Sequence, residues 1–137
     1  IGNNKFRKNI SSQIAHKFGN IIHSSSIISK NVNIGKGTVI FQQSTVQSST
    51  KIGENVIINT SSSIDHDCII EDFVHISPNA TLCGNVTIGV GTHIGAGSVI
   101  LPGVKIGNWS TIGAGAIVLS DIPDSVVVVG NPGKIIK

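Results

Sequence analysis

Residues 88–118 read IGVGTH-IGAGSV-ILPGVK-IGNWST-IGAGAI-V in groups of six, and each complete group begins with isoleucine. The spacing extends back to Ile22, so that all 17 positions taken every sixth residue from Ile22 to Val118 are aliphatic. Since 39% of the chain is hydrophobic, a chance run of this length in one fixed register has a probability on the order of 10⁻⁷. The repeat of six therefore reflects the fold.

A period of six fits neither a helix nor an alternating strand. The residue two before each aliphatic position is usually small or β-branched, as at Thr38, Ser44, Val56, Ser62, Cys68 and Ala80. This pattern indicates a short strand with one large and one small inward side chain, followed by a turn. Three such sides close a prism, so a coil takes about 18 residues and stacks on the next at about 4.8 Å. The sequence predicts a parallel β-helix of nearly six coils over residues 20–119, about 27 Å long.

The composition supports an all-β domain and excludes several classes of function. Only 4% of the 137 residues are aromatic and 12% are charged, so branched aliphatic residues, which favour strands, must fill the core. Four of the ten basic residues lie in residues 1–18, and the remaining six face seven acids, which leaves about −1 and argues against nucleic-acid binding. No apolar run is long enough to span a membrane. We expect a cytoplasmic protein without a disulfide, with Cys68 as a core thiol.

Several stretches resemble the hexapeptide-repeat acyltransferases: Ile34–Gly37, Ile88–Gly91, Ile94–Gly97, Ile112–Gly115 and the C-terminal run Gly130–Lys134. Within that family, the chain is most similar to the sialic acid O-acetyltransferases and the UDP-N-acetylbacillosamine N-acetyltransferases. The resemblance implies a left-handed coil, which the periodicity alone does not establish. It also implies a homotrimer that uses acetyl-CoA and no metal. The expected acceptor is a nucleotide-linked 4-amino-4,6-dideoxy sugar of bacterial surface glycan biosynthesis, with sialic acid-type O-acetylation as the alternative.

Both ends of the chain depart from the repeat. Residues 3–18 are expected to form a helix, capped by Asn3 or Asn4, with a stripe of Phe6, Ile10, Ile14 and Phe18. In the resembling enzymes a nucleotide-sugar-binding domain precedes the β-helix. Because the chain lacks Met and begins with Ile1, we expect residues 1–19 to be a remnant of that domain, a plain capping helix being the alternative. Residues 120–137 are expected to form a final strand and a tail. This helix and strand could cover the two ends of the β-helix.

The run Asp65-His66-Asp67-Cys68 concentrates the groups that suit acid–base chemistry. The aliphatic register continues through it, so its polar side chains must point outward from an intact scaffold. A general base near neutral pH needs a pKa near 7, and a neighbouring carboxylate raises the basicity of histidine. His66 is thus the candidate base. The resemblance selects Asp67 as its catalytic partner, although Asp65 also flanks it and the relatives often carry Glu in place of Asp67.

The remaining site residues follow mainly from the resemblance. Asn59, which begins the same polar stretch, is expected to bind the acceptor. His75 is expected to contact acetyl-CoA near its thioester, and Ala96 and Ala114, which lie one predicted coil apart, to line its pantetheine arm. His93 is expected to stack on His75 one coil away. Lys134 is expected either to face the CoA phosphates or to be a solvated tail lysine.

Two other functions use the same fold. A zinc enzyme similar to the γ-type carbonic anhydrases would need three imidazoles, which His66, His75 and His93 could supply. However, that family's pair of histidines five residues apart is missing. A non-catalytic or ice-binding β-helix would show columns of threonine, but Thr38 stacks on Val56 and Thr92 on Ser110.

Overall fold

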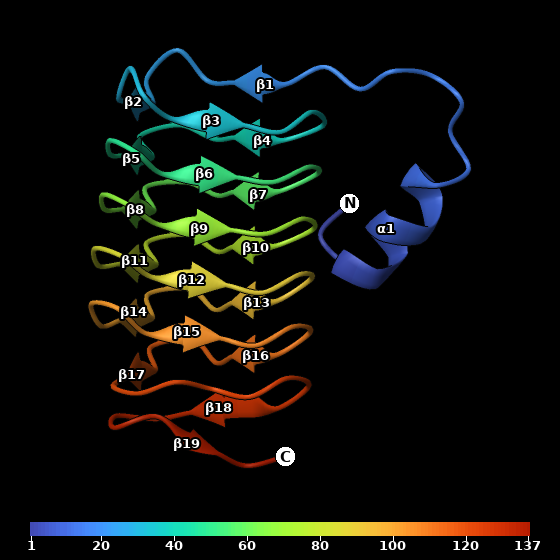
Figure 1. Ribbon diagram of the computed structural model, residues 1–137. Helices are drawn as coiled ribbons and strands as arrows, with labels where there is room; N and C mark the ends of the chain where they lie inside the picture. Colours follow the sequence, from blue (N-terminus) through green and yellow to red (C-terminus); the bar gives the residue numbers. More distant parts are fainter.

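The computed structural model describes all 137 residues as a triangular β-helix with one helix at its side (Figure 1). Nineteen short strands follow the helix. The elements are α1 (Asn4–Ser11), β1 (Ile21–Ile22), β2 (Ile27–Ile28), β3 (Asn33–Ile34), β4 (Val39–Ile40), β5 (Thr45–Val46), β6 (Lys51–Ile52), β7 (Ile57–Ile58), β8 (Ser63–Ile64), β9 (Ile69–Ile70), β10 (His75–Ile76), β11 (Thr81–Leu82), β12 (Thr87–Ile88), β13 (His93–Ile94), β14 (Val99–Ile100), β15 (Lys105–Ile106), β16 (Thr111–Ile112), β17 (Ile117–Val118), β18 (Val127–Val129) and β19 (Lys134–Ile135).

The strands form three sheets that are the sides of a prism, and all pairs are parallel except the last, β18 with β19. The eight-stranded sheet runs β1-β4-β7-β10-β13-β16-β18-β19, the six-stranded sheet β17-β14-β11-β8-β5-β2, and the five-stranded sheet β15-β12-β9-β6-β3. Each strand pairs with the strand one coil away, as in the pairs Ile21↔Val39, Thr45↔Ser63 and His75↔His93. The spacing of these pairs equals three repeats of six, so the coil length predicted from the sequence is confirmed.

The coil is left-handed, as the resemblance implied. In Figure 1, β3, β6 and β9 lie in front and run to the right, whereas β4, β7 and β10 lie behind and run to the left. Each turn lies below the previous one, so the chain rotates in the left-handed sense as it advances.

Three corners join the sheets in every coil. The first corner connects the eight-stranded to the six-stranded sheet, as at residues 95–98, and the second connects the six-stranded to the five-stranded sheet, as at residues 65–68. The third returns to the eight-stranded sheet, as at residues 89–92. Most corners contain one residue with positive φ, and ten of these residues are not glycine, Asp67 with φ 57° among them.

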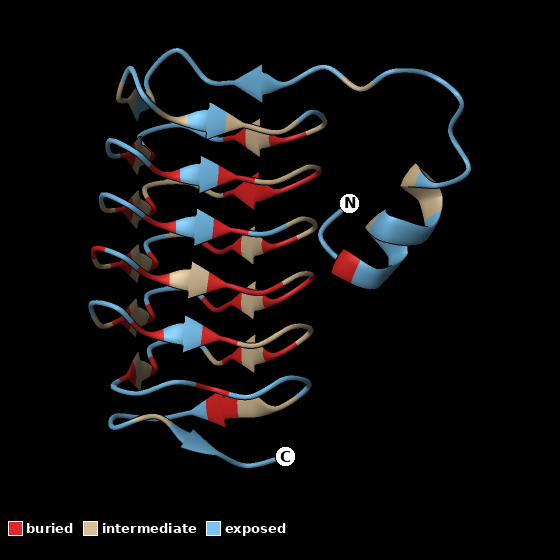
Figure 2. Cartoon of the chain, in the orientation of Figure 1, coloured by how far each residue is buried: buried red, intermediate tan, exposed pale blue.

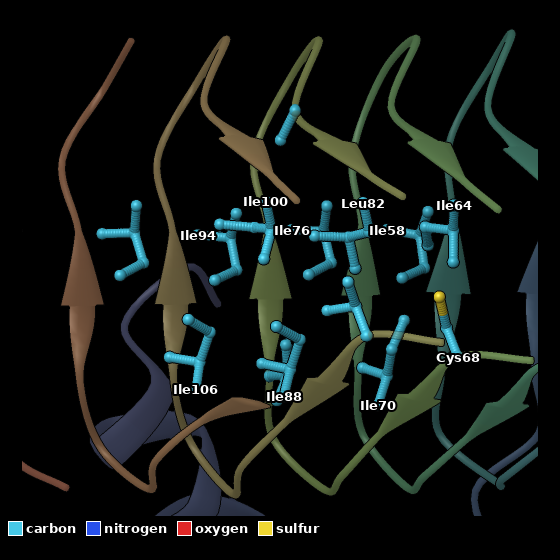
Figure 3. Packing of buried hydrophobic residues seen from close by; sticks show 14 of the residues in the cluster. Ile58, Ile64, Cys68, Ile70, Ile76, Leu82, Ile88, Ile94, Ile100 and Ile106 are labelled. Atoms are coloured by element: carbon cyan, nitrogen blue, oxygen red, sulfur yellow. The ribbon is translucent and has the colours of Figure 1, made fainter. Parts of the chain in front are cut away.

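The repeated aliphatic positions form one continuous core. All of those from Ile40 to Val118 are buried, and Figure 3 shows Ile58, Ile76 and Ile94 in one column inside the prism. The small inward residues are also buried, and their hydroxyls bond to backbone carbonyls; Thr92 Oγ1, for example, donates to Gly107 O at 2.6 Å. Cys68 is fully buried in this core, as predicted, and both cysteines are free thiols.

The two ends differ from each other. At the C-terminal end, β18 pairs with β16 and β19 pairs antiparallel with β18, which covers the last coil as predicted. At the other end, Ile22 is 45% exposed, and the first coil is pale blue or tan in Figure 2. The expectation that the N-terminal helix covers this end is wrong, because α1 lies along the third corner instead (Figure 1).

The helix is also shorter than predicted. Asn3 caps it by accepting a hydrogen bond from Phe6 N, but it ends at Ser11 rather than near residue 18. The hydroxyls of Ser11 and Ser12 bond to the carbonyls of Lys8 and Asn9, and serine in this role competes with helix continuation. The predicted apolar stripe does not form a packed face, because Phe6 and Ile14 are exposed.

Polar contacts hold α1 to the third corner. Arg7 donates to Asn55 O at 2.9 Å and to Phe73 O at 2.7 Å, and Asn4 Nδ2 donates to Gly91 O at 3.0 Å. Lys8 Nζ lies 5.2 Å from the centre of the Trp109 ring. α1 is too short to cross a membrane, and the chain has no other helix.

The core predicts where substitutions are costly. We expect Ile88→Ala, at a fully buried position of β12, to lower the free energy of unfolding by about 2–5 kcal/mol through lost contacts and a cavity. The neighbouring Thr87 points outward, so Thr87→Ala should cost under about 0.5 kcal/mol. Denaturant unfolding of both variants at one protein concentration checks this, and equal losses would contradict the inward and outward assignment.

Candidate active site

His66 and Asp67 lie together at the second corner, between β8 and β9. His66 Nδ1 and Asp67 Oδ2 are 2.8 Å apart, and both side chains are more than half exposed. Asp67 occupies the positive-φ turn position, and its backbone N–H donates to Ser48 O at 3.0 Å. Asp65 Oδ1 accepts from the backbone N–H of His66 at 2.8 Å. The backbone of the turn thus holds a carboxylate on each side of the histidine.

This arrangement defines the state of the imidazole. The hydrogen bond to Asp67, followed by the charge of Asp65, raises the pKa of His66 above its ordinary value of 6.5. With Nδ1 bonded to a carboxylate, the neutral ring carries its proton on Nδ1 and leaves the Nε2 lone pair free. The contact that the sequence left open is therefore made by Asp67, and Asp65 contributes through its charge.

A groove runs along the second corner from His66. Its first part has about 540 Å³ of open volume and is lined by Asp65, His66, Cys83, Gly84, Asn85, Pro102 and Gly103. A second part of about 570 Å³ shares Pro102 and Gly103 with the first and continues to Leu119 and Asp121. His66 therefore lies at one end of a groove that follows the axis of the β-helix.

Gly84 lies directly against the imidazole, and sequence reasoning missed it. A Cβ at this position would be 2.7 Å from Cε1 and 2.8 Å from Nε2 of His66. The neighbouring amides of Cys83 and Asn85 donate to Ile100 O and His66 O, whereas the amide of Gly84 has no acceptor in the chain. The sequence could have predicted this contact, because residue 84 follows residue 66 by one coil and therefore stacks on it.

The residues expected to bind acetyl-CoA lie elsewhere on the prism. His75 is on β10 of the eight-stranded sheet, and Asn59 at the first corner lies beside it, with Asn59 Nδ2 and His75 Nε2 3.2 Å apart. Ala96 and Ala114 are exposed and stack at the first corner, where Gly115 N donates to Ala96 O at 2.8 Å. Lys134 is exposed on β19.

The predicted stacking of His75 on His93 is confirmed. The two ring centres are 4.9 Å apart and the ring planes differ by 2°. Burial, followed by the charge of His93, lowers the pKa of His75 to about 4. Burial, followed by the charge of Arg7, also lowers the pKa of His93. Both imidazoles are therefore neutral at neutral pH.

One chain thus holds two separate groups of candidate residues. His66 and Asp67 belong to the second corner, whereas Asn59, Ala96 and Ala114 belong to the first. His66 also lies apart from the stacked His75 and His93, so the three imidazoles required by the zinc alternative do not meet within a chain. No group of three or more His, Cys, Asp or Glu side chains is arranged to hold a metal ion.

The chain resembles solved acetyltransferases over its whole length. It is 34% identical to a histidine mutant of perosamine N-acetyltransferase from Caulobacter crescentus, solved with CoA and GDP-perosamine; the match covers 100% of this chain and 67% of that chain with a TM-score of 0.98. The acetyltransferase domain of PglB from Neisseria gonorrhoeae, solved with acetyl coenzyme A, is 38% identical over 99% of this chain and 68% of that chain, with a TM-score of 0.96. WeeI from Acinetobacter baumannii is 32% identical over 99% and 68%, with a TM-score of 0.93.

No curated protein matches the chain significantly. The family model for the bacterial transferase hexapeptide (six repeats) matches residues 49–84, 67–101 and 85–120, which together span more than half of the sequence. These segments include the candidate base, the stacked histidines and both alanines. The repeat, the left-handed coil and these matches agree, and the chain belongs to the bacterial hexapeptide transferase family.

Proposed function

We propose that the chain transfers the acetyl group of acetyl-CoA to the amine of a nucleotide-linked amino sugar, with His66 as the general base. The observation that carries this proposal is the His66–Asp67 hydrogen bond, which leaves Nε2 free at the end of a groove. Two similar proteins support the choice of reactants, because one was solved with CoA and GDP-perosamine and another with acetyl coenzyme A.

His66 and Asp67 are the acid–base groups of the proposed reaction. The amine nitrogen attacks the thioester carbonyl carbon and forms the C–N bond, while His66 Nε2 takes a proton from that nitrogen. The tetrahedral intermediate then collapses, the C–S bond breaks, and the CoA sulfur leaves with the proton that His66 returns. Asp67 keeps the proton of the neutral ring on Nδ1 and stabilises the imidazolium in between.

The oxyanion of that intermediate needs a hydrogen-bond donor. The amide N–H of Gly84 is suited to this role, because it has no acceptor in the chain and its residue lies against the reactive edge of His66. At the third corner, the amide at the same position of the turn is used: Glu54 N donates to Asp72 Oδ1, and Val90 N donates to Asn108 Oδ1. One coil beyond Gly84, Pro102 offers no such acceptor.

We further propose that the working form is a homotrimer. In a threefold assembly with axes parallel to the β-helix, the second corner of one chain can face the first corner of its neighbour. His66 of one chain would then meet Asn59, His75, Ala96 and Ala114 of the next, with the pantetheine arm running along the alanine column. Three other expectations from the sequence stay predictions: the cytoplasmic location, the origin of residues 1–19 in a nucleotide-sugar-binding domain, and a contact between Lys134 and the CoA phosphates.

O-acetylation of a sialic acid-type acceptor is the second candidate, because His66 could equally take a proton from a hydroxyl. The similar proteins favour the amine, since one is a perosamine N-acetyltransferase. Measuring thiol release from acetyl-CoA with GDP-perosamine and with sialic acid separates the two candidates. Thiol release with sialic acid but not with GDP-perosamine would show that the activity is O-acetylation and not N-acetylation.

Removing the base should abolish most of the activity. We expect His66→Ala to lower kcat/KM by about 10²- to 10⁴-fold, the usual contribution of a general base. The side chain is largely exposed, so the variant should keep the unfolding midpoint and the oligomeric state of the parent protein. Thiol release with acetyl-CoA and GDP-perosamine checks the rate, and an unchanged rate would show that His66 is not the base.

The carboxylate should set the acid limb of the pH profile. His66 accepts a proton only when it is neutral, so kcat/KM should fall as the pH drops through its pKa, which lies above 6.5. Asp67→Asn removes the main cause of this raised pKa, so the acid limb should move to lower pH. Asparagine also tolerates positive φ, which keeps the turn intact. An acid limb that stays in place would exclude the Asp67 contact as its cause.

Gly84 should be sensitive to a single methyl group. The backbone of Gly84 does not have positive φ, so Gly84→Ala fits the chain but pushes the imidazole of His66 aside. We expect kcat to fall by about 10- to 100-fold, as for a misplaced catalytic group. Gly19→Ala is the matched control, since no atom lies within 4 Å of the added Cβ. Full activity in Gly84→Ala would contradict the placement of the ring.

A further inference from the structure

The same polar arrangement occurs in two successive coils of the eight-stranded sheet. Asn59 Nδ2 lies 3.2 Å from His75 Nε2, and Ser77 Oγ lies 2.8 Å from His93 Nε2. In each case the polar partner lies at the first corner of the coil before that of the histidine. The two histidines are also register partners on β10 and β13, and their rings are stacked and parallel.

Three contacts restrict the imidazole of His75. His93 covers one face of the ring, Asn59 contacts Nε2, and Gly2 O lies 3.4 Å from Nδ1. A carbonyl can only accept, so Nδ1 carries the proton and Nε2 accepts from the amide N–H of Asn59. The ring therefore has one tautomer and one orientation.

His93 is itself held in place. The hydroxyl of Ser77 bonds to its Nε2, and the register of β13 against β10 fixes the height of its ring relative to His75. The side chains whose charges act on His75 are His93 and Arg7, and both disfavour its protonated form. The stack is consequently one of neutral rings, which can approach closely without repulsion.

We propose that His93 is a positioning residue, whose ring holds the imidazole of His75 in the orientation that meets acetyl-CoA. This inference rests on the proposed function, in which His75 contacts the acetyl donor. Without the ring of His93, one face of His75 would be open and its side chain could rotate away from Asn59. Removing the ring of His93 should therefore weaken acetyl-CoA binding but have little effect on the proton transfer at His66.

The test compares His93→Ala, which removes the ring, with His93→Phe, which keeps a stacking ring but no titrating group. Thr87→Ala is the matched control. Thr87 points outward from the five-stranded sheet on β12, the strand that directly precedes that of His93. KM for acetyl-CoA and kcat are measured for each variant. In parallel, NMR titration of the His75 ring, assigned with His75→Ala, reads its tautomer and its pKa independently of turnover.

We expect His93→Ala to raise KM for acetyl-CoA by about 3- to 10-fold, the loss of one aromatic contact, with kcat nearly unchanged. The pKa of its His75 should move closer to the ordinary value of 6.5, and the ring should lose its single tautomer. His93→Phe and Thr87→Ala should retain the parent KM for acetyl-CoA and the single tautomer of His75. If His93→Ala leaves KM and the titration of His75 unchanged, or if His93→Phe is equally impaired, the inference is wrong. A parent protein that releases no thiol but keeps a locked His75 would refute the proposed function and not the stacked arrangement.

Discussion

The parallel pairing of each strand with the strand one coil later is the constraint on which the rest of the structure depends. Because every coil has the same length, Ile64, Leu82 and Ile100 lie in one buried column of the six-stranded sheet. The same register gives outward side chains fixed neighbours above and below. A polar residue on this surface is therefore positioned by a rigid scaffold, which suits a site that must hold its groups accurately.

The candidate base illustrates how much the turn contributes beyond this register. Asp67 takes the positive-φ position, and from there its carboxylate reaches His66 Nδ1. The short side chain of Asp is sufficient for this contact, at 2.8 Å from Nδ1 to Oδ2. Gly84 completes the arrangement from the next coil by leaving space for the ring. The proposed acid–base chemistry thus depends on three residues that two adjacent turns supply.

Periodicity in the sequence was enough to predict the coil length, the core and the stacking of His75 on His93. It could not establish the hand, which came from the resemblance, because a spacing of six is the same in either sense. The extent of the N-terminal helix was predicted wrongly. The prediction rested on an apolar stripe, which contains no information on the hydroxyls of Ser11 and Ser12 that bond to backbone carbonyls of the helix. The contact between His66 and Asp67 depends on backbone torsions, which residue types alone do not specify.

The candidate base and the residues expected to contact acetyl-CoA lie on different corners, and we propose that they complete one site only between chains. Coexpression of His66→Ala with Ala96→Trp, each of which we expect to have little activity alone, tests this proposal most directly. In mixed oligomers, a site that takes His66 from the second variant and Ala96 from the first is intact, so thiol release should return. If thiol release does not return in verified mixed oligomers, a site shared between chains is contradicted.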